Sequence, residues 1–204
     1  MDFVRKHAFK IAVLALCAAM GIYLYVSSNK EAGPNLDQNY KAPSFELTDL
    51  DGNKVSLENT NGKVRVIYFF YSNCPDVCPP TTYLMSEAQN ELKEKGTFGS
   101  DVEFLSITFD PVRDTTETIR KFAGKFDVDA AGWKFLREDS EEDTKQLMKD
   151  FGLGLVKDEN GYFTHADAIT FVDRTGNVRK AITGSITDTQ ADDVVKIVNA
   201  LVKG

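Results

Sequence analysis

Two cysteines and one histidine are the residues of this sequence best suited to metal or redox chemistry. Cys74 and Cys78 form a C-x-x-x-C pair between a strongly apolar run, residues 64–71, and the start of a predicted helix. Free N–H groups and the positive dipole end at a helix N-terminus favour the thiolate, the form that attacks disulfides and binds metals. Two thiolates suit Cu(I), and with an imidazole the set also suits Cu(II), whereas structural zinc normally needs a fourth protein ligand.

A static disulfide is the alternative interpretation of the pair. Such a bond between Cys74 and Cys78 would close a very short loop, and the stabilisation from a disulfide falls as the closed loop shortens. The junction between a buried strand and a helix, at the open end of a parallel sheet, is also where α/β folds bind ligands. We therefore favour a functional dithiol.

His165 is the only histidine outside the N-terminal segment, where His7 lies. A histidine that follows a predicted turn at Asn160-Gly161 is, taken alone, most often a solvated loop residue. Its partnership with the cysteine pair is what makes it a candidate ligand. We therefore expect folding to bring this imidazole to the two sulfurs.

The elements that must position these residues follow one another as strand, helix, strand and helix, then an antiparallel hairpin and a last helix. Apolar runs indicate the strands, a period near 3.6 indicates the helices, and Asp51-Gly52 indicates a hairpin turn. This order predicts a mixed α/β sheet with helices on both faces, as in a thioredoxin-like domain. The predicted strands are 45–48, 54–57, 64–71, 102–109, 133–136, 168–173 and 178–182. Four helices are predicted: one that ends near residue 95, one that begins after an N-cap at Asp114, and two that span 141–151 and 188–202.

Proline placement argues against a general thiol–disulfide enzyme. Thioredoxin-type oxidoreductases usually hold a cis-proline before the later hairpin strand, facing the cysteines. In this sequence no proline follows Pro111.

The N-terminal segment has the pattern of a membrane anchor. Residues 11–26 are an unbroken run of 16 apolar or small residues, with three basic residues before it and acidic residues after it. The positive-inside rule then places residues 1–7 in the cytoplasm. We expect a single-pass transmembrane helix at 8–27, a linker at 28–40 and an extracytoplasmic domain at 41–204, in the cell membrane with the globular domain on its outer face.

Two other processing schemes fit this segment less well. A cleaved signal peptide would end in small residues of the A-x-A type, and only a loose Val26-x-Ser28 is present. A lipoprotein would carry its lipid on Cys17, but the bulky Leu16 precedes that residue and the apolar run continues beyond it. We favour an uncleaved anchor.

Composition excludes two broad classes. The chain of 204 residues is 42% hydrophobic, which is enough for a packed core and excludes wholesale disorder. Its net charge is −7, the opposite of what a nucleic-acid binder normally carries. The acidic excess favours a soluble outer domain that does not adhere to anionic lipid.

Three motifs together resemble the Sco (SenC) family, which comprises membrane-anchored thioredoxin-like proteins that help assemble the copper centres of cytochrome c oxidase. The motifs are residues 71–79 (YSNCPDVCP), residues 110–114 (DPVRD), and His165 placed 87 residues after Cys78. The resemblance covers most of the chain, from the anchor to the last helix. The sequence departs from it around His165, where Thr-His-Ala-Asp-Ala replaces the more usual Asp-His-Ser.

The resemblance implies copper, as Cu(I) and Cu(II), bound by Cys74, Cys78 and His165, with the two cysteines also cycling between dithiol and disulfide. Asp110 follows a strand that neighbours the cysteine-bearing one and could line the site as an outer partner. Asp76, between the cysteines, could tune their charge or be solvated. The departure at His165 leaves the partner that orients its ring undetermined.

Three functions of different classes use these residues. The first is a metallochaperone that passes copper to the oxidase subunit carrying the dinuclear copper centre. The second is a thiol–disulfide reductase that keeps that subunit's cysteines reduced, and the third is a copper or redox sensor. A further copper chaperone or a thiol reductant is an expected partner. Whether the protein is an enzyme stays open: we do not expect a classical one, but the dithiol is compatible with thiol–disulfide oxidoreductase activity.

Overall fold

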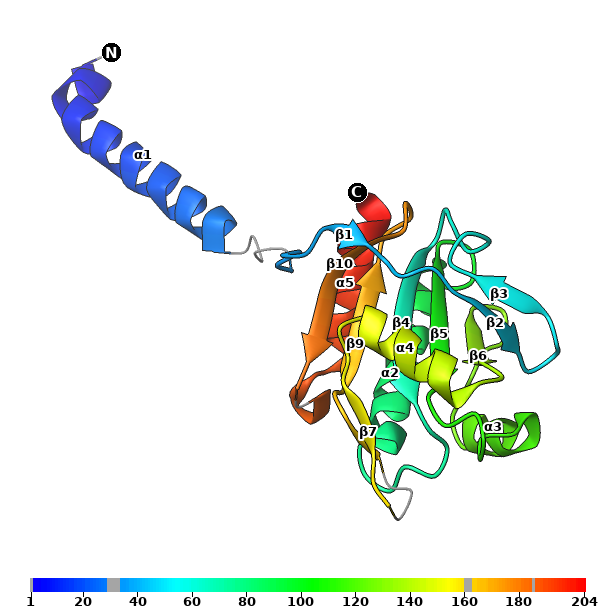
Figure 1. The fold of residues 1–204 in the computed structure, drawn as a ribbon. Coiled ribbons are helices and arrows are strands. Elements are labelled where there is room, and N and C mark those ends of the chain that lie inside the picture. Colours follow the sequence, from blue (N-terminus) through cyan, green and yellow to red (C-terminus); the bar gives the residue numbers. More distant parts are fainter. Residues whose placement is uncertain (1, 29–33, 160–162, 185) are drawn as a thin grey trace. The chain divides into compact units, whose positions relative to one another are not determined.

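A computed structural model describes residues 2–28, 34–159, 163–184 and 186–204 (Figure 1). The chain divides into two units, residues 1–33 and 34–204. In the first unit the apolar run is helical, as predicted, within α1 (Asp2–Ser28). A search of the described residues finds no helix with the length and apolar character that a membrane crossing requires.

An eight-stranded mixed sheet forms the framework of the second unit. Its strands are β1 (Tyr40–Lys41), β2 (Glu46–Asp49), β3 (Lys54–Ser56), β4 (Val64–Phe70), β5 (Val102–Thr108), β6 (Trp133–Arg137), β9 (Ala168–Val172) and β10 (Asn177–Thr183). They are ordered β1-β10-β9-β4-β5-β6-β2-β3 (Figure 1). β4, β5 and β6 are parallel and all other neighbours are antiparallel. The predicted order of parallel crossovers followed by an antiparallel hairpin is therefore confirmed.

The centre of this sheet is built from the most apolar segments. Every residue of β4 and of β5 is buried. Because successive side chains of a strand point to opposite faces, adjacent aromatic residues of β4 serve different layers. Phe70 stacks on Phe122 with ring centroids 5.3 Å apart, and Phe69 meets Phe151 edge-on at 5.5 Å. The prediction of a strand buried on both faces is confirmed.

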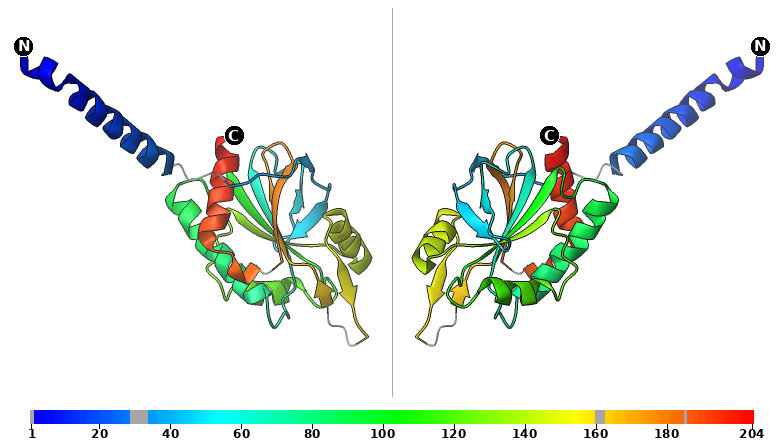
Figure 2. Two further views of the ribbon diagram at one scale, coloured as in Figure 1. Left: turned by 90° about the vertical axis from the view of Figure 1, so that its left-hand side faces the viewer. Right: turned by 90° about the vertical axis from the view of Figure 1, so that its right-hand side faces the viewer.

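Helices cover both faces of the sheet, as predicted. They are α2 (Cys78–Glu94), α3 (Thr116–Ala123), α4 (Glu141–Asp150) and α5 (Ala191–Lys203), with a 3₁₀ turn η1 (Ile186–Asp188) before the last. α2 and α5 lie side by side on one face, and α4 lies against the other (Figure 2). Among the residues whose burial is described, the buried apolar ones all fall between Ala42 and Leu201. We therefore expect residues 34–204 to fold without the first unit.

The starts of two helices differ from the prediction. Thr115, not Asp114, is the N-cap of α3, since its hydroxyl accepts a hydrogen bond from the Thr118 N–H at 3.2 Å. The Asp114 carboxylate instead turns inward to a partner on another element. The last helix begins at Ala191 rather than at 188, because the Asp193 carboxylate accepts from the Gln190 N–H at 3.0 Å and fixes the start there.

A separate two-stranded sheet carries the candidate histidine. β7 (Leu155–Lys157) pairs antiparallel with β8 (Phe163–His165), which confirms the predicted hairpin. Its predicted Asn160-Gly161 turn lies outside the described residues. Among the described residues this hairpin makes no ladder with the main sheet, although only two residues separate His165 from the start of β9.

The turn before β6 leaves no room for a side chain. A Cβ added to Gly132 would lie 2.6 Å from the Phe98 ring and 2.7 Å from the Gly99 nitrogen. We expect Gly132→Ala to lower the free energy of unfolding of residues 34–204 by about 2 kcal/mol, because overpacking displaces backbone. Urea denaturation measures this loss. Gly154→Ala is the matched control, since nothing lies within 4 Å of its added Cβ, and equal stability losses in the two variants would contradict the prediction.

Candidate functional site

The cysteine pair lies where β4 ends and α2 begins. Cys78 is the first residue of α2, and its backbone N–H donates to Cys74 Sγ at 3.3 Å. Both cysteines are free thiols. Cys74 keeps 7% of its surface exposed and Cys78 none. The helix start therefore holds both sulfurs together, with Cys74 on the side that a partner can reach.

The two sulfurs have opposite electrostatic characters. The Cys78 thiol, then the His165 imidazole and the backbone N–H groups of Asp76 and Cys78, stabilise negative charge on Cys74. Against the cost of burial, they lower the pKa of Cys74 to about 4. The hydrogen bond that Cys78 makes to Cys74, together with burial, raises the pKa of Cys78 far above its usual value. At neutral pH the pair is therefore one thiolate and one thiol.

His165 reaches this pair from the β7–β8 hairpin. Its imidazole makes a hydrogen-bonding contact with the Cys74 sulfur, and its side chain is only 7% exposed. Phe109 lies 4.7 Å and Tyr71 6.2 Å from it, measured between ring centroids. The expectation that folding brings the lone histidine of the domain to the cysteines is met for Cys74.

Asp167 is a neighbour of the ring that the sequence reasoning missed. Its Oδ1 atom lies 3.0 Å from His165 Nδ1, and its side chain is 18% exposed. The ring N–H is not aimed at this oxygen, so the contact is an ion pair rather than a directed hydrogen bond. A carboxylate two positions after a histidine lies on the same side of an extended chain, and this spacing is the signal that could have identified Asp167.

The ion pair changes the protonation of the ring. Burial is the largest effect on His165 and acts against the charged form. The Asp167 carboxylate and the Cys74 sulfur outweigh it and raise the pKa of His165 to about 9. Without a bound metal, the site at neutral pH is therefore a thiolate beside an imidazolium.

Asp110 and Asp114 are both buried next to the site, and their carboxylates have different partners. Asp110 is fully buried and pairs with Arg113 Nε, while its Oδ1 atom has no hydrogen-bond partner among the described residues. Asp114 accepts from the Ser72 N–H at 2.9 Å and from the Thr108 hydroxyl. Asp114 thus fixes the loop that leads to Cys74, which explains why it does not cap α3.

The remaining positions near the site are on its outer side. The Asp76 side chain is exposed, and only its backbone N–H acts on Cys74. Arg113, which the sequence reasoning did not single out, lies with its guanidinium carbon 6.0 Å from the Tyr71 ring centre and 5.3 Å from the Phe163 ring centre. A cation therefore lies over two aromatic rings, of which Tyr71 interacts with Cys74.

The donor types fit copper, but their present positions do not form a coordination sphere. Across the described ranges, no three His, Cys, Asp or Glu side chains are placed to hold a metal ion together. Cys74 is instead the common partner of the Cys78 thiol and the imidazole. Two sulfurs and an imidazole are soft and borderline donors of the kind that copper prefers. Binding an ion therefore requires the Cys78 proton to leave and the outer donors to turn toward a common point.

Comparison with known proteins places this geometry in a family. A family model described as SCO1/SenC matches residues 34–202. A SCO1/SenC family lipoprotein from Bacillus anthracis superposes with a TM-score of 0.72 at 32% identity, covering 84% of this chain and 98% of its own.

Two further solved structures share the fold. BsSco, a member of the Sco family of cytochrome c oxidase assembly proteins in which a disulfide switch was identified, gives a TM-score of 0.71 at 30% identity, covering 82% of this chain and 96% of its own. Yeast Sco1 with copper bound gives 0.66 at 26% identity, covering 81% and 90%. Relatives of this chain therefore include copper-bound proteins. Since the family model spans nearly all of the second unit, the chain belongs to the SCO1/SenC family and has its thioredoxin-like fold.

Proposed function

We propose that this protein captures copper through Cys74, Cys78 and His165 and passes it to the cytochrome c oxidase subunit that carries the dinuclear copper centre. The observation that carries the proposal is the contact between the His165 imidazole and the Cys74 sulfur, 91 positions apart in the sequence. A dithiol alone serves redox chemistry, whereas a third donor of a different type is what a copper site adds. The copper-bound yeast Sco1 and the oxidase-assembly role of BsSco support the assignment.

The chain's own residues divide the work of holding the ion. Cys74 supplies a thiolate that is already deprotonated, and Cys78 supplies the second sulfur once its proton is released. The β7–β8 hairpin brings the imidazole, and because it makes no ladder with the main sheet, it can shift without breaking that sheet. Copper in this scheme is cargo, which leaves by exchange of its thiolate ligands for those of the receiving subunit.

A thiol–disulfide reductase is the second candidate, and the unequal cysteines favour it. The Cys74 thiolate would attack a disulfide of the oxidase subunit and release one of its thiolates. Cys78 would then lose its proton and displace the second thiolate, which leaves a Cys74–Cys78 disulfide and a reduced subunit. A thiol reductant must restore the dithiol. The low pKa of Cys74 keeps it a thiolate at neutral pH for the first step. A mixed disulfide on Cys74 then removes the negative charge that most raises the pKa of Cys78, which favours the second step.

For the location we propose a single-pass anchor in the cell membrane with residues 1–7 in the cytoplasm. The support is the apolar run at 11–26 and the basic residues before it. The Cys17 thiol lies within that run and has no role in the site. The dithiol and the imidazole would then operate outside the membrane.

The test that separates the two functions is His165→Ala in residues 34–204. The variant should bind Cu(II) more than about 100-fold more weakly, because loss of a ligand costs more than loss of an outer partner, which costs about 10- to 100-fold. Titration calorimetry with a competing chelator measures the affinity. In cells, His165→Ala should impair oxidase assembly as severely as Cys74→Ala; full assembly with His165→Ala and none with Cys74→Ala would overturn copper delivery in favour of the reductase.

The pH dependence of alkylation tests the thiolate. With its pKa lowered to about 4, Cys74 is charged at any higher pH, so its reaction with iodoacetamide should reach half its maximum near pH 4. An ordinary cysteine does so near about pH 8.5. Mass spectrometry of the labelled peptides separates it from Cys78, which should react more slowly than Cys74 at every pH while Cys74 is unlabelled. His165→Ala should move the pH midpoint of Cys74 alkylation upward. A midpoint near pH 8 in the unmodified chain would refute the pairing of a Cys74 thiolate with a His165 imidazolium.

The role of Asp167 is tested by removing its charge. Asp167→Asn should weaken Cu(II) binding by about 10- to 100-fold, because the ring loses the group that orients it. Nuclear magnetic resonance titration of the apo form should show the pKa of His165 falling below its value of about 9. Glu159→Gln removes an equal charge from an exposed position of the same hairpin segment, and identical effects of the two substitutions would exclude a specific role for Asp167.

A further inference from the structure

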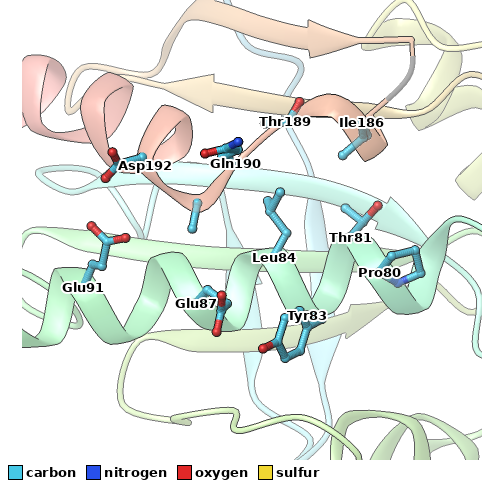
Figure 3. Close-up of a pocket in the computed structure, with 11 residues that line it drawn as sticks. Pro80, Thr81, Tyr83, Leu84, Glu87, Glu91, Ile186, Thr189, Gln190 and Asp192 are labelled. Atoms are coloured by element: carbon cyan, nitrogen blue, oxygen red, sulfur yellow. The ribbon is translucent and has the colours of Figure 1, made fainter.

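A groove of about 490 Å³ runs along α2 beside the start of α5 and is separate from the site described above (Figure 3). One end is formed by Pro80 and Thr81, two and three positions after Cys78. Leu84 points into it from α2, and Ile186 lies across from Thr81 (Figure 3). The groove therefore begins next to the cysteine pair and has an apolar floor.

The rim of the groove is acidic. Glu87, Glu91 and Asp192 line it, and no lysine, arginine or histidine does so among the described residues. Glu91 and Asp192 contact Lys95 and Lys196 outside the groove, at 3.4 and 4.0 Å, through exposed side chains that can exchange partners. Glu87 forms no ion pair in the described part of the chain and lies beside the exposed Tyr83.

We propose that this groove docks a cationic, amphipathic segment of the protein that exchanges thiols or copper with the cysteine pair. The inference rests on the proposed function and names the chemistry of its partner. Apolar side chains of the segment would cover Leu84 and Ile186, and its lysines or arginines would meet Glu87 and Glu91. From Thr81 to Glu91 the helix advances about 15 Å, so the groove accommodates about three turns of a docked helix.

Other occupants fit the groove less well. A membrane surface is disfavoured because cell membranes present anionic lipid, which the acidic rim repels. A metal ion is disfavoured because, in the part of the chain that the structure describes, no three acidic or other ligating side chains lie close enough to share one. Charge complementarity with an apolar floor selects a basic protein segment.

Docking here has a chemical consequence for the cysteines. Cys74 is only 7% exposed and Cys78 is inaccessible, so a random encounter seldom presents a partner sulfur in line with Cys74. A segment seated in the groove holds its own sulfur beside the N-terminus of α2 and raises its effective concentration there. The groove would thus strengthen the binding of the partner, which lowers KM. It would leave the reactivity of the Cys74 thiolate unchanged.

The experiment uses a synthetic helical peptide with leucines on one face and lysines on the opposite face. The peptide carries one cysteine as a mixed disulfide with 2-nitro-5-thiobenzoate. The Cys74 thiolate attacks the peptide sulfur and the coloured thiobenzoate leaves. Cys78 then displaces the peptide thiolate and closes the Cys74–Cys78 disulfide. With residues 34–204, the lysine peptide should react at least about fivefold faster at low concentration than the same peptide with glutamate for lysine, and high salt should reduce the difference.

Glu87→Lys should remove most of this preference, by about three- to tenfold. Glu46→Lys, an equal charge reversal at an exposed position of β2 on the far side of the sheet order, should change it by less than about twofold. Equal rates for the two peptides would overturn the proposal that the groove docks a basic segment. Equal effects of the two substitutions would overturn it too, because general surface charge would then explain the preference. The same samples titrated with copper test the proposed function separately, since Glu87 touches none of its three ligands.

Discussion

The site depends on keeping a negative sulfur in a place that is almost completely buried. Burial by itself would hold Cys74 as a neutral thiol, and three kinds of group prevent this. These are the Cys78 thiol, the imidazole of His165, and backbone N–H groups at the start of α2. Two of the three are fixed by the junction of β4 and α2, so a local feature of the chain creates most of the charge. The imidazole alone arrives from a distant segment.

This division gives the site a rigid part and a part that can move. The cysteine loop is held by the helix start and by Asp114, whose carboxylate binds the Ser72 N–H. The imidazole sits on a hairpin with its own two-stranded ladder, positioned by Asp167 and by contacts with Phe109 and Tyr71. Ring contacts allow several offset and edge-on arrangements, whereas a ladder of hydrogen bonds fixes one register. The hairpin is therefore the element that can adjust when an ion takes the place of the hydrogen bonds around Cys74.

The sequence predicts what depends on short-range patterns. β4, the hairpin of β2 and β3, and the strand–helix junction at the cysteines follow from apolar runs, turn residues and the prolines at 79 and 80. A capping pattern that is visible locally predicts Asp114 as an N-cap, whereas its carboxylate accepts from the Thr108 hydroxyl and from the Ser72 N–H, 42 positions away. Arg113 and Asp167 were missed for a related reason. Their roles depend on which rings and nitrogens tertiary packing brings near, and no local pattern specifies this.

The unequal protonation of the two cysteines links the two candidate functions. In both, Cys78 must lose its proton, and its hydrogen bond to Cys74 and burial raise the pKa of this thiol in the free protein. An ion that binds Cys74 withdraws the negative charge to which Cys78 donates, and so removes the largest cause of that raised pKa. A partner sulfur bonded to Cys74 also neutralises it and has the same effect. In the proposed scheme one electrostatic change therefore prepares Cys78 both for copper and for resolution of a mixed disulfide. The imidazole, which can ligate an ion but cannot form a disulfide, is the group that would distinguish the two functions.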